Sequence, residues 1–115
     1  MVKDRIEVRV YLPSRDREGR ELPLWLKDTI ETIAVEEMCK QYGGSTKTTG
    51  YGEWINPETK ELCKENVNVI SSYTTQETYE KGKPELEARL EFIKAYSRQS
   101  ALLYATIPVG TVTLL

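Results

Sequence analysis

Aromatic side chains, together with a few cationic and amide side chains, are the groups of this sequence best suited to bind a ligand. Tyr51 and Trp54 are interleaved with Gly50 and Gly52, and their rings could stack on a planar molecule. The same aromatic side chains equally suit the rim of a core or a subunit interface. The candidate ligand-binding residues are Tyr51, Trp54, Arg98, Gln99, Tyr104 and Arg9.

Residue types that commonly catalyse reactions or bind metal ions are scarce in this chain. It contains no histidine, so the commonest general base is missing and no histidine can activate a serine or cysteine. Cys39 and Cys63 are 24 positions apart and belong to no CxxC pair, which argues against a zinc site and against a redox dithiol. We expect Cys39 in the core. The sequence therefore predicts no catalytic residue, no cofactor and no metal site.

Glutamate pairs are the remaining candidates for acid and base chemistry. Glu36 and Glu37 are adjacent, and a later segment carries Glu85, Glu87 and Glu91. Their positions fall on the polar faces of two predicted helices, where carboxylates are normally solvated. We expect these side chains to face water and to take no part in a reaction.

A stretch rich in glycine and threonine, residues 43–50, has the residue types of a phosphate-binding loop. A P-loop lies between a strand and a helix, whereas here a predicted helix comes first and a strand follows. The favoured interpretation is a helix stop, and a weak anion nest is the alternative. Gly50 and Gly52 indicate either a ligand close to the backbone or, more commonly, a bulge or a large neighbouring side chain such as Trp54.

The strands are predicted from alternation and from β-branched and aromatic residues. Ile6, Val8 and Val10 alternate with polar residues, which is typical of a strand with one buried face. Pro57 presets the backbone for a turn between two segments rich in Thr, Val and Tyr. The predicted strands are residues 5–12, 46–55 and 61–73, and a last strand over 101–106 and 109–115 that Pro108 interrupts.

Two helices are predicted between these strands. The first has Pro23 in its first turn and an apolar stripe from Leu26, and it stops at Gly43-Gly44. A capping-box pattern lies at residues 74–77, but a proline disrupts a helix interior, so we place the start of the second helix at Pro84. The core residues predicted on the helices are Ile30, Ile33, Leu90 and Ile93.

The predicted order of elements is βαββαβ, and it fits one domain over residues 1–115. Two right-handed crossovers would place both helices on one face of a four-stranded antiparallel sheet, a ferredoxin-like α+β fold. The second face would be uncovered, and Tyr11, Tyr51, Trp54 or Tyr104 on it would call for a partner subunit or a ligand. We also expect the last strand beside residues 46–55, which would group Trp54 with Arg98 and Gln99.

The second half of the chain is similar to a known family. The similarity lies in Gly50-x-Gly52-x-Trp54 before a turn and in Tyr96 with Gln99-Ser100-x-Leu102 before the last strand. Over residues 48–112 this pattern resembles a family of small bacterial domains of unknown function. The resemblance implies the same architecture, and it implies no activity because none is assigned to that family.

Composition narrows the classes of partner. The formal net charge is −2 and the pI is about 5.3, so nothing attracts the protein to nucleic acid or to anionic membranes. The first residues alternate apolar and charged side chains, unlike a secretory signal, and no apolar run is long enough to span a bilayer. We therefore expect a cytoplasmic protein.

Three functions remain open from the sequence. The first is a non-enzymatic binding or regulatory module that forms homo-oligomers and uses an aromatic sheet surface for a protein or small-molecule partner. The second is a protein that binds or sequesters a small anionic, nucleotide-like ligand. The third is a cofactor-independent enzyme that uses tyrosine or arginine side chains.

Overall fold

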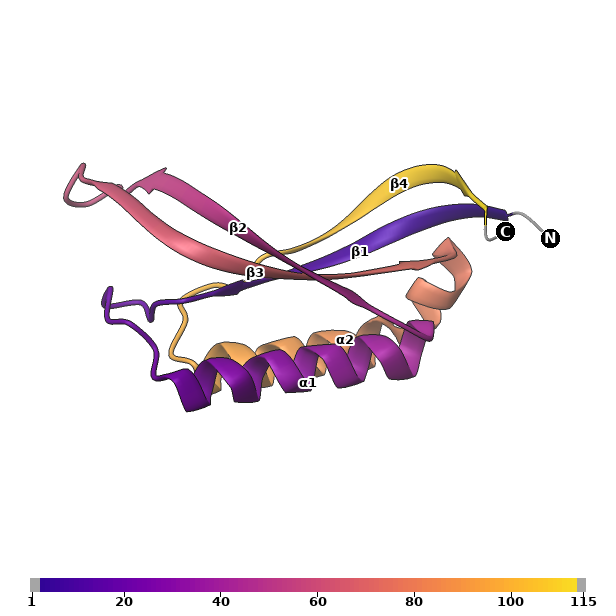
Figure 1. The fold of residues 1–115 in the computed structure, drawn as a ribbon, viewed down its shortest axis with the longest axis horizontal. Helices are drawn as coiled ribbons and strands as arrows, with labels where there is room; N and C mark the ends of the chain where they lie inside the picture. Colours follow the sequence, from indigo (N-terminus) through magenta and orange to yellow (C-terminus); the bar gives the residue numbers. More distant parts are fainter. Residues whose placement is uncertain (1–2, 114–115) are drawn as a thin grey trace.

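The computed structural model describes residues 3–113, and its elements follow the βαββαβ order (Figure 1). The elements are β1 (Lys3–Pro13), α1 (Leu24–Tyr42), β2 (Thr46–Ile55), β3 (Leu62–Thr74), α2 (Gln76–Tyr96) and β4 (Tyr104–Val112). The ferredoxin-like fold class predicted from the sequence is confirmed. The expected strand residues Leu114 and Leu115 lie outside the described residues.

The four strands form one antiparallel sheet in the order β2-β3-β1-β4, with both helices on the same face (Figure 1). The expectation that the last strand lies beside β2 is wrong. The first crossover joins β1 to β2 and leaves one strand position between them, which β3 occupies. The second crossover joins β3 to β4 and passes over β1, which lies between these two strands. As a result β2 and β4 form opposite edges of the sheet.

The core lies between the sheet and the two helices. Alternation along β1 points Val8 and Val10 to the helices, and both are completely buried. Of the residues predicted for the helix core, Ile30, Leu90 and Ile93 are buried, as expected. Ile33 is only half-buried and packs at the margin of the core.

Helix α1 begins and ends where the sequence indicated. It follows Pro23, and Gly43 ends it in the left-handed conformation with φ 86°, its N–H bonding to the Cys39 carbonyl at 2.8 Å. The expectation that Cys39 is in the core is wrong, because the neighbouring Met38 takes the inward position and Cys39 is exposed. Its thiol lies 3.6 Å from the Ser45 hydroxyl.

Helix α2 begins eight residues earlier than Pro84, so that prediction is also wrong. Thr75 caps the helix by accepting a hydrogen bond from the Thr78 N–H at 3.2 Å. Tyr79 before Pro84 and Leu86 after it are both buried, so tertiary packing on both sides holds the helix together through the proline. The proline leaves one backbone carbonyl without its helical donor.

One of the glutamates expected to face water is in fact buried between the helices. Glu37 is 4% exposed, whereas its neighbour Glu36 is exposed. The Gln41 amide donates to the Glu37 carboxylate at 2.7 Å, and the Arg89 guanidinium lies 3.6 Å from its second oxygen. The buried charge is therefore paired, as a charge between two helices requires.

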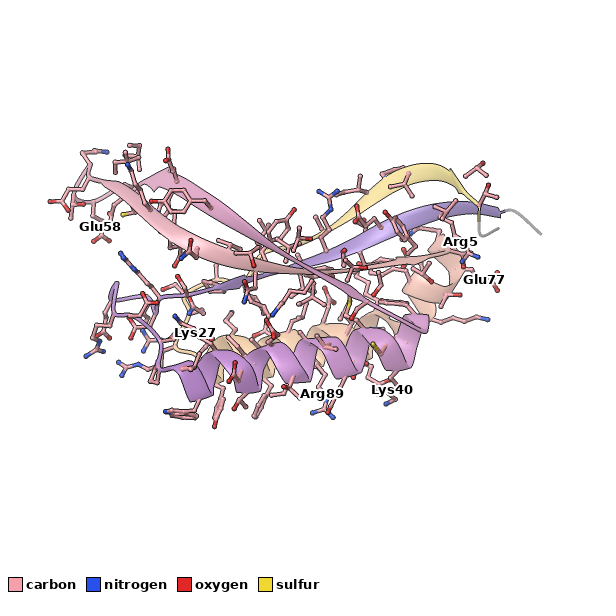
Figure 2. All side chains as sticks on the ribbon, viewed as in Figure 1. Arg5, Lys27, Lys40, Glu58, Glu77 and Arg89 are labelled. Carbon is pink, nitrogen blue, oxygen red and sulfur yellow. The ribbon has the colours of Figure 1, made fainter. Side chains whose placement is uncertain are left out.

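Strands β2 and β3 form a long hairpin whose tip extends past the start of α1 (Figure 1). The turn is organised by Asn56, whose side-chain oxygen accepts from the Glu58 and Thr59 N–H groups at 2.9 and 3.2 Å. Figure 2 shows Glu58 at this tip, well away from the helices. Because the hairpin projects beyond the helices, the molecule is elongated, with extents of 50 × 24 × 23 Å.

Candidate functional site

The sheet face opposite the helices, here called the open face, has no element of the described residues lying over it (Figure 1). Because Ile6, Val8 and Val10 point to the helices, the alternate residues of β1 and their cross-strand partners point the other way. Of the four aromatic residues considered for this face, Tyr11 and Trp54 lie on it, whereas Tyr51 and Tyr104 point to the helix side. The principal side chains of the open face are Arg5, Glu7, Arg9, Tyr11, Trp54, Val67, Val69, Tyr73 and Ile107.

Arg9 is engaged by a carboxylate of its own strand. Its guanidinium contacts one Glu7 carboxylate oxygen through Nε at 2.8 Å and through Nη2 at 2.7 Å. The hydrogen bond to Glu7 is the main reason why the pKa of Arg9 is raised. Tyr73 and Ile107 stand on either side of Glu7 in the sheet, and Glu7 is only 8% exposed. The open face therefore carries a neutralised ion pair between apolar groups.

Tyr51 and Trp54 do not form a single aromatic site. They are three positions apart on β2, so their side chains point to opposite faces of the sheet. Both are exposed. Val67, and not Trp54 as the sequence suggested, is the large neighbour at the strand glycines, since its Cγ2 lies 3.4 Å from where a Cβ on Gly52 would stand.

Arg98 and Gln99 connect the end of α2 to the loop after β1. The Arg98 guanidinium bonds to the Glu18 carboxylate at 2.8 Å, and the Gln99 amide donates to the Arg15 carbonyl at 2.7 Å. Arg98 has a positive φ of 57°, which an arginine adopts only when its surroundings hold it there. The predicted grouping with Trp54 is wrong, because Trp54 lies on β2 at the other edge of the sheet.

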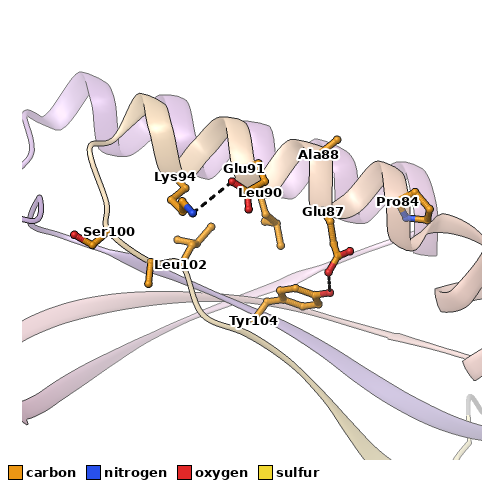
Figure 3. A pocket seen from close by; sticks show the side chains of 10 residues that line it. Pro84, Glu87, Ala88, Leu90, Glu91, Lys94, Ser100, Leu102 and Tyr104 are labelled. Carbon is orange, nitrogen blue, oxygen red and sulfur yellow. Dashed lines mark hydrogen bonds and ion pairs between the residues drawn. The ribbon is translucent and has the colours of Figure 1, made fainter.

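Tyr104 lies in a groove between α2 and β4, and Figure 3 shows its ring beneath the helix. Its hydroxyl donates to a Glu87 carboxylate oxygen at 2.5 Å and lies 3.2 Å from the Tyr79 hydroxyl. Burial is the main reason why the pKa of Tyr104 is raised, and the hydrogen bond to Glu87 raises it further. The phenol is therefore protonated at neutral pH and acts here as a hydrogen-bond donor.

The rest of this groove combines apolar and charged side chains. Its volume is about 510 Å³, with Leu90 and Leu102 as apolar walls. Lys94 and Glu91 pair with each other at 3.5 Å (Figure 3). The sequence predicts that Glu87 faces water. Its position next to the buried Leu86, at the edge of the apolar stripe of α2, is the signal that it could instead contact the sheet.

The six candidate residues thus occupy four separate places. Trp54 and Arg9 are on the open face, Tyr51 on the helix side of the hairpin, Tyr104 in the groove, and Arg98 and Gln99 in the loop contact. Within residues 3–113, no cluster of three or more metal-ligating side chains could hold an ion. No helix of this part of the chain is long and apolar enough to cross a membrane.

Comparison with known proteins gives fold relatives and no sequence relatives. No protein-family model matches the chain, and no curated protein matches its sequence. The resemblance to a family of unknown function therefore stays a prediction.

Several solved structures share the fold. A phage SAM lyase in complex with S-methyl-5'-thioadenosine matches with a TM-score of 0.63 and 12% identity, over 96% of this chain and 90% of the lyase. CutA from Synechococcus elongatus matches with a TM-score of 0.56 and 10% identity, over 97% of this chain and 85% of that protein. The periplasmic divalent cation tolerance protein CutA from Archaeoglobus fulgidus gives a TM-score of 0.55 and 11% identity, over 91% and 83% of the two chains. Such low identities show a common fold.

Proposed function

We propose that this protein is a non-enzymatic binding module that self-associates through the open face of its sheet. The observation that carries the proposal is the composition of that face. Val67, Val69 and Tyr73 of β3 lie there next to Tyr11 of β1 and Ile107 of β4, and no helix within residues 3–113 covers them. An apolar surface that spans several strands is a common sign of a protein–protein contact.

The charged groups of the open face support the same proposal. Burying an unpaired charge at an interface costs several kcal/mol in general, whereas a charge that already has its partner costs less. Glu7 and Arg9 are already paired, and Glu7 is already buried. A second copy of the chain could therefore cover this face without leaving either charge unpaired, and homo-oligomers usually use such a self-complementary contact.

Light scattering across a concentration series tests the proposal. We expect the mass of the wild-type protein to exceed the 13.2 kDa of one chain and the Val69→Lys variant to return that single-chain mass. Phe92→Ser is the matched control, because Phe92 is an exposed apolar residue on the helix layer. A wild-type mass of one chain at every concentration would contradict the proposal, and so would dissociation by Phe92→Ser alone.

A second candidate function is binding of a small nucleotide-like molecule. Cavities of ligand size support it, since the groove beside Tyr104 measures about 510 Å³. The shared fold of the phage SAM lyase in complex with S-methyl-5'-thioadenosine also supports it. A thermal-shift screen of nucleosides and nucleotides tests this function, because a ligand at 100 times its Kd stabilises the native state by about 2.7 kcal/mol. No shift with any compound would contradict it.

A further inference from the structure

A second cavity lies on the helix side of the sheet, between the β2–β3 hairpin and the first turns of α1, where Lys27 and Ile30 line it. We call it the hairpin pocket. Its volume is about 290 Å³, and the buried side chains of Leu12 and Ile30 form its floor. This size is close to the lower end of the range for small-molecule sites.

The wall of the hairpin pocket is built from hydrogen-bonding side chains that are mostly uncharged. Thr49 of β2 and Asn66 and Asn68 of β3 line it from the sheet, and Ser14 lines it from the loop after β1. Successive residues of a strand alternate between faces, so both asparagine amides stand on the same wall. Hydroxyls and amides can each donate and accept, which suits a ligand that carries both kinds of group.

One of the two asparagines is fixed and the other is available. The Asn68 amide donates to a Glu31 carboxylate oxygen at 3.1 Å, and its oxygen accepts from the Thr49 hydroxyl at 3.2 Å. Lys47 neutralises Glu31 at 3.3 Å. Asn66 is exposed, so its amide is free to turn to a ligand without breaking a contact of the fold.

Charge at the mouth of the pocket is balanced. Lys27 lies between the start of α1 and the hairpin (Figure 2) and is paired with Glu21. The hydrogen bond from Lys27 is the main reason why the pKa of Glu21 is lowered, so the Glu21 carboxyl is ionised at neutral pH. The paired charges give the pocket little net attraction for a highly charged ligand, and they favour a neutral polar one.

An aromatic ring stands beside the pocket, outside the residues that line it. Tyr51 stands directly opposite Asn66 in the hairpin, on the same face and 62% exposed. Directly opposite residues of paired strands have Cβ atoms about 5 Å apart. A planar ligand stacked on Tyr51 would therefore present its edge to the Asn66 amide, which is the geometry in which asparagine pairs with the edge of a base.

We propose that the hairpin pocket and the Tyr51 ring beside it bind a nucleoside, with the base stacked on Tyr51, its edge at the Asn66 amide, and the ribose at Ser14 and Thr49. This proposal rests on the second candidate function, and it assigns both the site and the class of ligand. The base supplies the plane and the amide-like edge, and the ribose supplies the hydroxyls.

Calorimetric titration with adenosine, cytidine and free ribose tests the proposal. We expect the nucleosides to bind and ribose alone to bind at least tenfold more weakly, because it lacks the base. Tyr51→Ala should raise the Kd for the nucleoside about fivefold or more, the effect of losing one stacked base. Asn66→Ala should raise it about twofold to tenfold, the effect of one neutral hydrogen bond. Tyr51→Phe keeps the ring and should restore most of the affinity.

Two matched controls locate the site. Trp54→Ala removes an aromatic ring from the opposite face of the same strand, and Tyr104→Phe removes the hydroxyl in the groove beside α2. Neither should change the Kd. Amide signals of Thr49, Asn66 and Asn68 should shift during an NMR titration with adenosine.

Four results would overturn the proposal: no binding of either nucleoside, ribose binding as tightly as adenosine, affinity lost through Trp54→Ala or Tyr104→Phe, or unchanged affinity in Tyr51→Ala. Affinity lost through Tyr104→Phe would still leave small-molecule binding as a function, located in the other cavity. Light scattering on Tyr51→Ala separates this test from self-association, since the proposal expects its mass to equal that of the wild type. Circular dichroism checks that each variant is folded.

Discussion

The two faces of strand β1 differ in what they contact. On the helix side, Val8 and Val10 are completely buried under α1 and α2. On the open face, Tyr11 is partly exposed, and Glu7 and Arg9 form an ion pair from the strand positions on either side of Val8. One strand thus stabilises the monomer with one set of residues and presents the other set to whatever lies outside it.

This contrast shows where the free energy of folding comes from. Apolar area removed from water contributes about 25 cal/mol per Å², so the covered face supplies most of the stability of a single chain. The open face can contribute a comparable term only when another molecule covers it. Substitutions on the two faces should therefore differ in size, and also in whether their effect depends on protein concentration.

The largest effect is expected in the helix layer that covers the sheet. Ile30→Ala and Leu90→Ala should each lower the free energy of unfolding by about 2 to 5 kcal/mol, because both side chains are buried and would leave a cavity. Urea denaturation followed by circular dichroism measures the change. A loss of only a few tenths of a kcal/mol in both variants would show that the helices do not pack on this face.

A matched pair of valines compares the faces directly. Val10→Ala should cost about 2 kcal/mol at every protein concentration, since Val10 is completely buried within one chain. Val69→Ala, on the open face of the neighbouring strand, should cost less than about 1 kcal/mol in dilute solution. Repeating both unfolding curves at high concentration sharpens the test: only the cost of Val69→Ala should grow. Equal and constant costs would remove the distinction between the faces.

A smaller effect is expected where the helices meet. A Cβ on Gly82 would overlap the Gln41 side-chain oxygen, and the Gln41 amide nitrogen donates to both the Glu37 carboxylate and the Gly82 carbonyl. Gly82→Ala should therefore destabilise the protein, because it displaces Gln41 from the buried carboxylate.

The same substitution in a Gln41→Ala background should have the opposite sign. Alanine is favoured over glycine in a helix by about 1 kcal/mol, and nothing would then obstruct its methyl group. Denaturant curves of the two single variants and the double variant give the coupling between the sites. An identical effect of Gly82→Ala in both backgrounds would show that Gln41 is not held at this position.

The smallest effect is expected at Glu65, on the open face near the hairpin. Burial raises the pKa of its carboxyl above the ordinary value of 4.5, against hydrogen bonds from the Arg15 N–H and the Ser14 hydroxyl. A raised pKa means that the folded protein holds the Glu65 proton more tightly than the unfolded chain does, so protonation stabilises the folded state. This stabilisation is complete when the pH is below the ordinary pKa, and it is lost as the pH rises through the raised pKa. Glu65→Gln should therefore be slightly more stable than the wild type at neutral pH.

Urea titrations between neutral and acidic pH check the sign of this prediction. The advantage of Glu65→Gln should shrink as the pH falls, because the wild-type carboxyl is then also neutral. The glutamine oxygen can still accept from the Arg15 N–H. An advantage that grows on acidification would contradict the raised pKa.

Alternation and helical periodicity were sufficient to predict the fold class, since Val8 and Val10 mark the buried face of β1 and Ile30 marks that of α1. The errors arose where tertiary contacts outweigh local rules. Pro84 lies inside α2 because residues on both sides of it are buried, and Glu37 is buried because Gln41 and Arg89 reach it from the two helices.

The candidate site was less predictable than the fold. Sequence spacing tells which face of a strand a residue is on. Tyr51 and Trp54 are three positions apart on β2, and this spacing alone implies that they point to opposite faces. Which strands are neighbours depends on the crossovers. The prediction placed β4 beside β2 instead of β1, and for this reason it grouped Trp54 with Arg98. Glu87 and Tyr104, 17 positions apart, meet only because α2 packs over β4.

The projecting hairpin also determines how the molecule moves through water. The radius of gyration is 15.2 Å. A compact chain of this length would have about 13 Å. An elongated particle has more friction than a sphere of equal mass, so a single chain will leave a gel-filtration column early and sediment slowly. Elution volume alone would report a larger mass, and only a method independent of shape can count the chains.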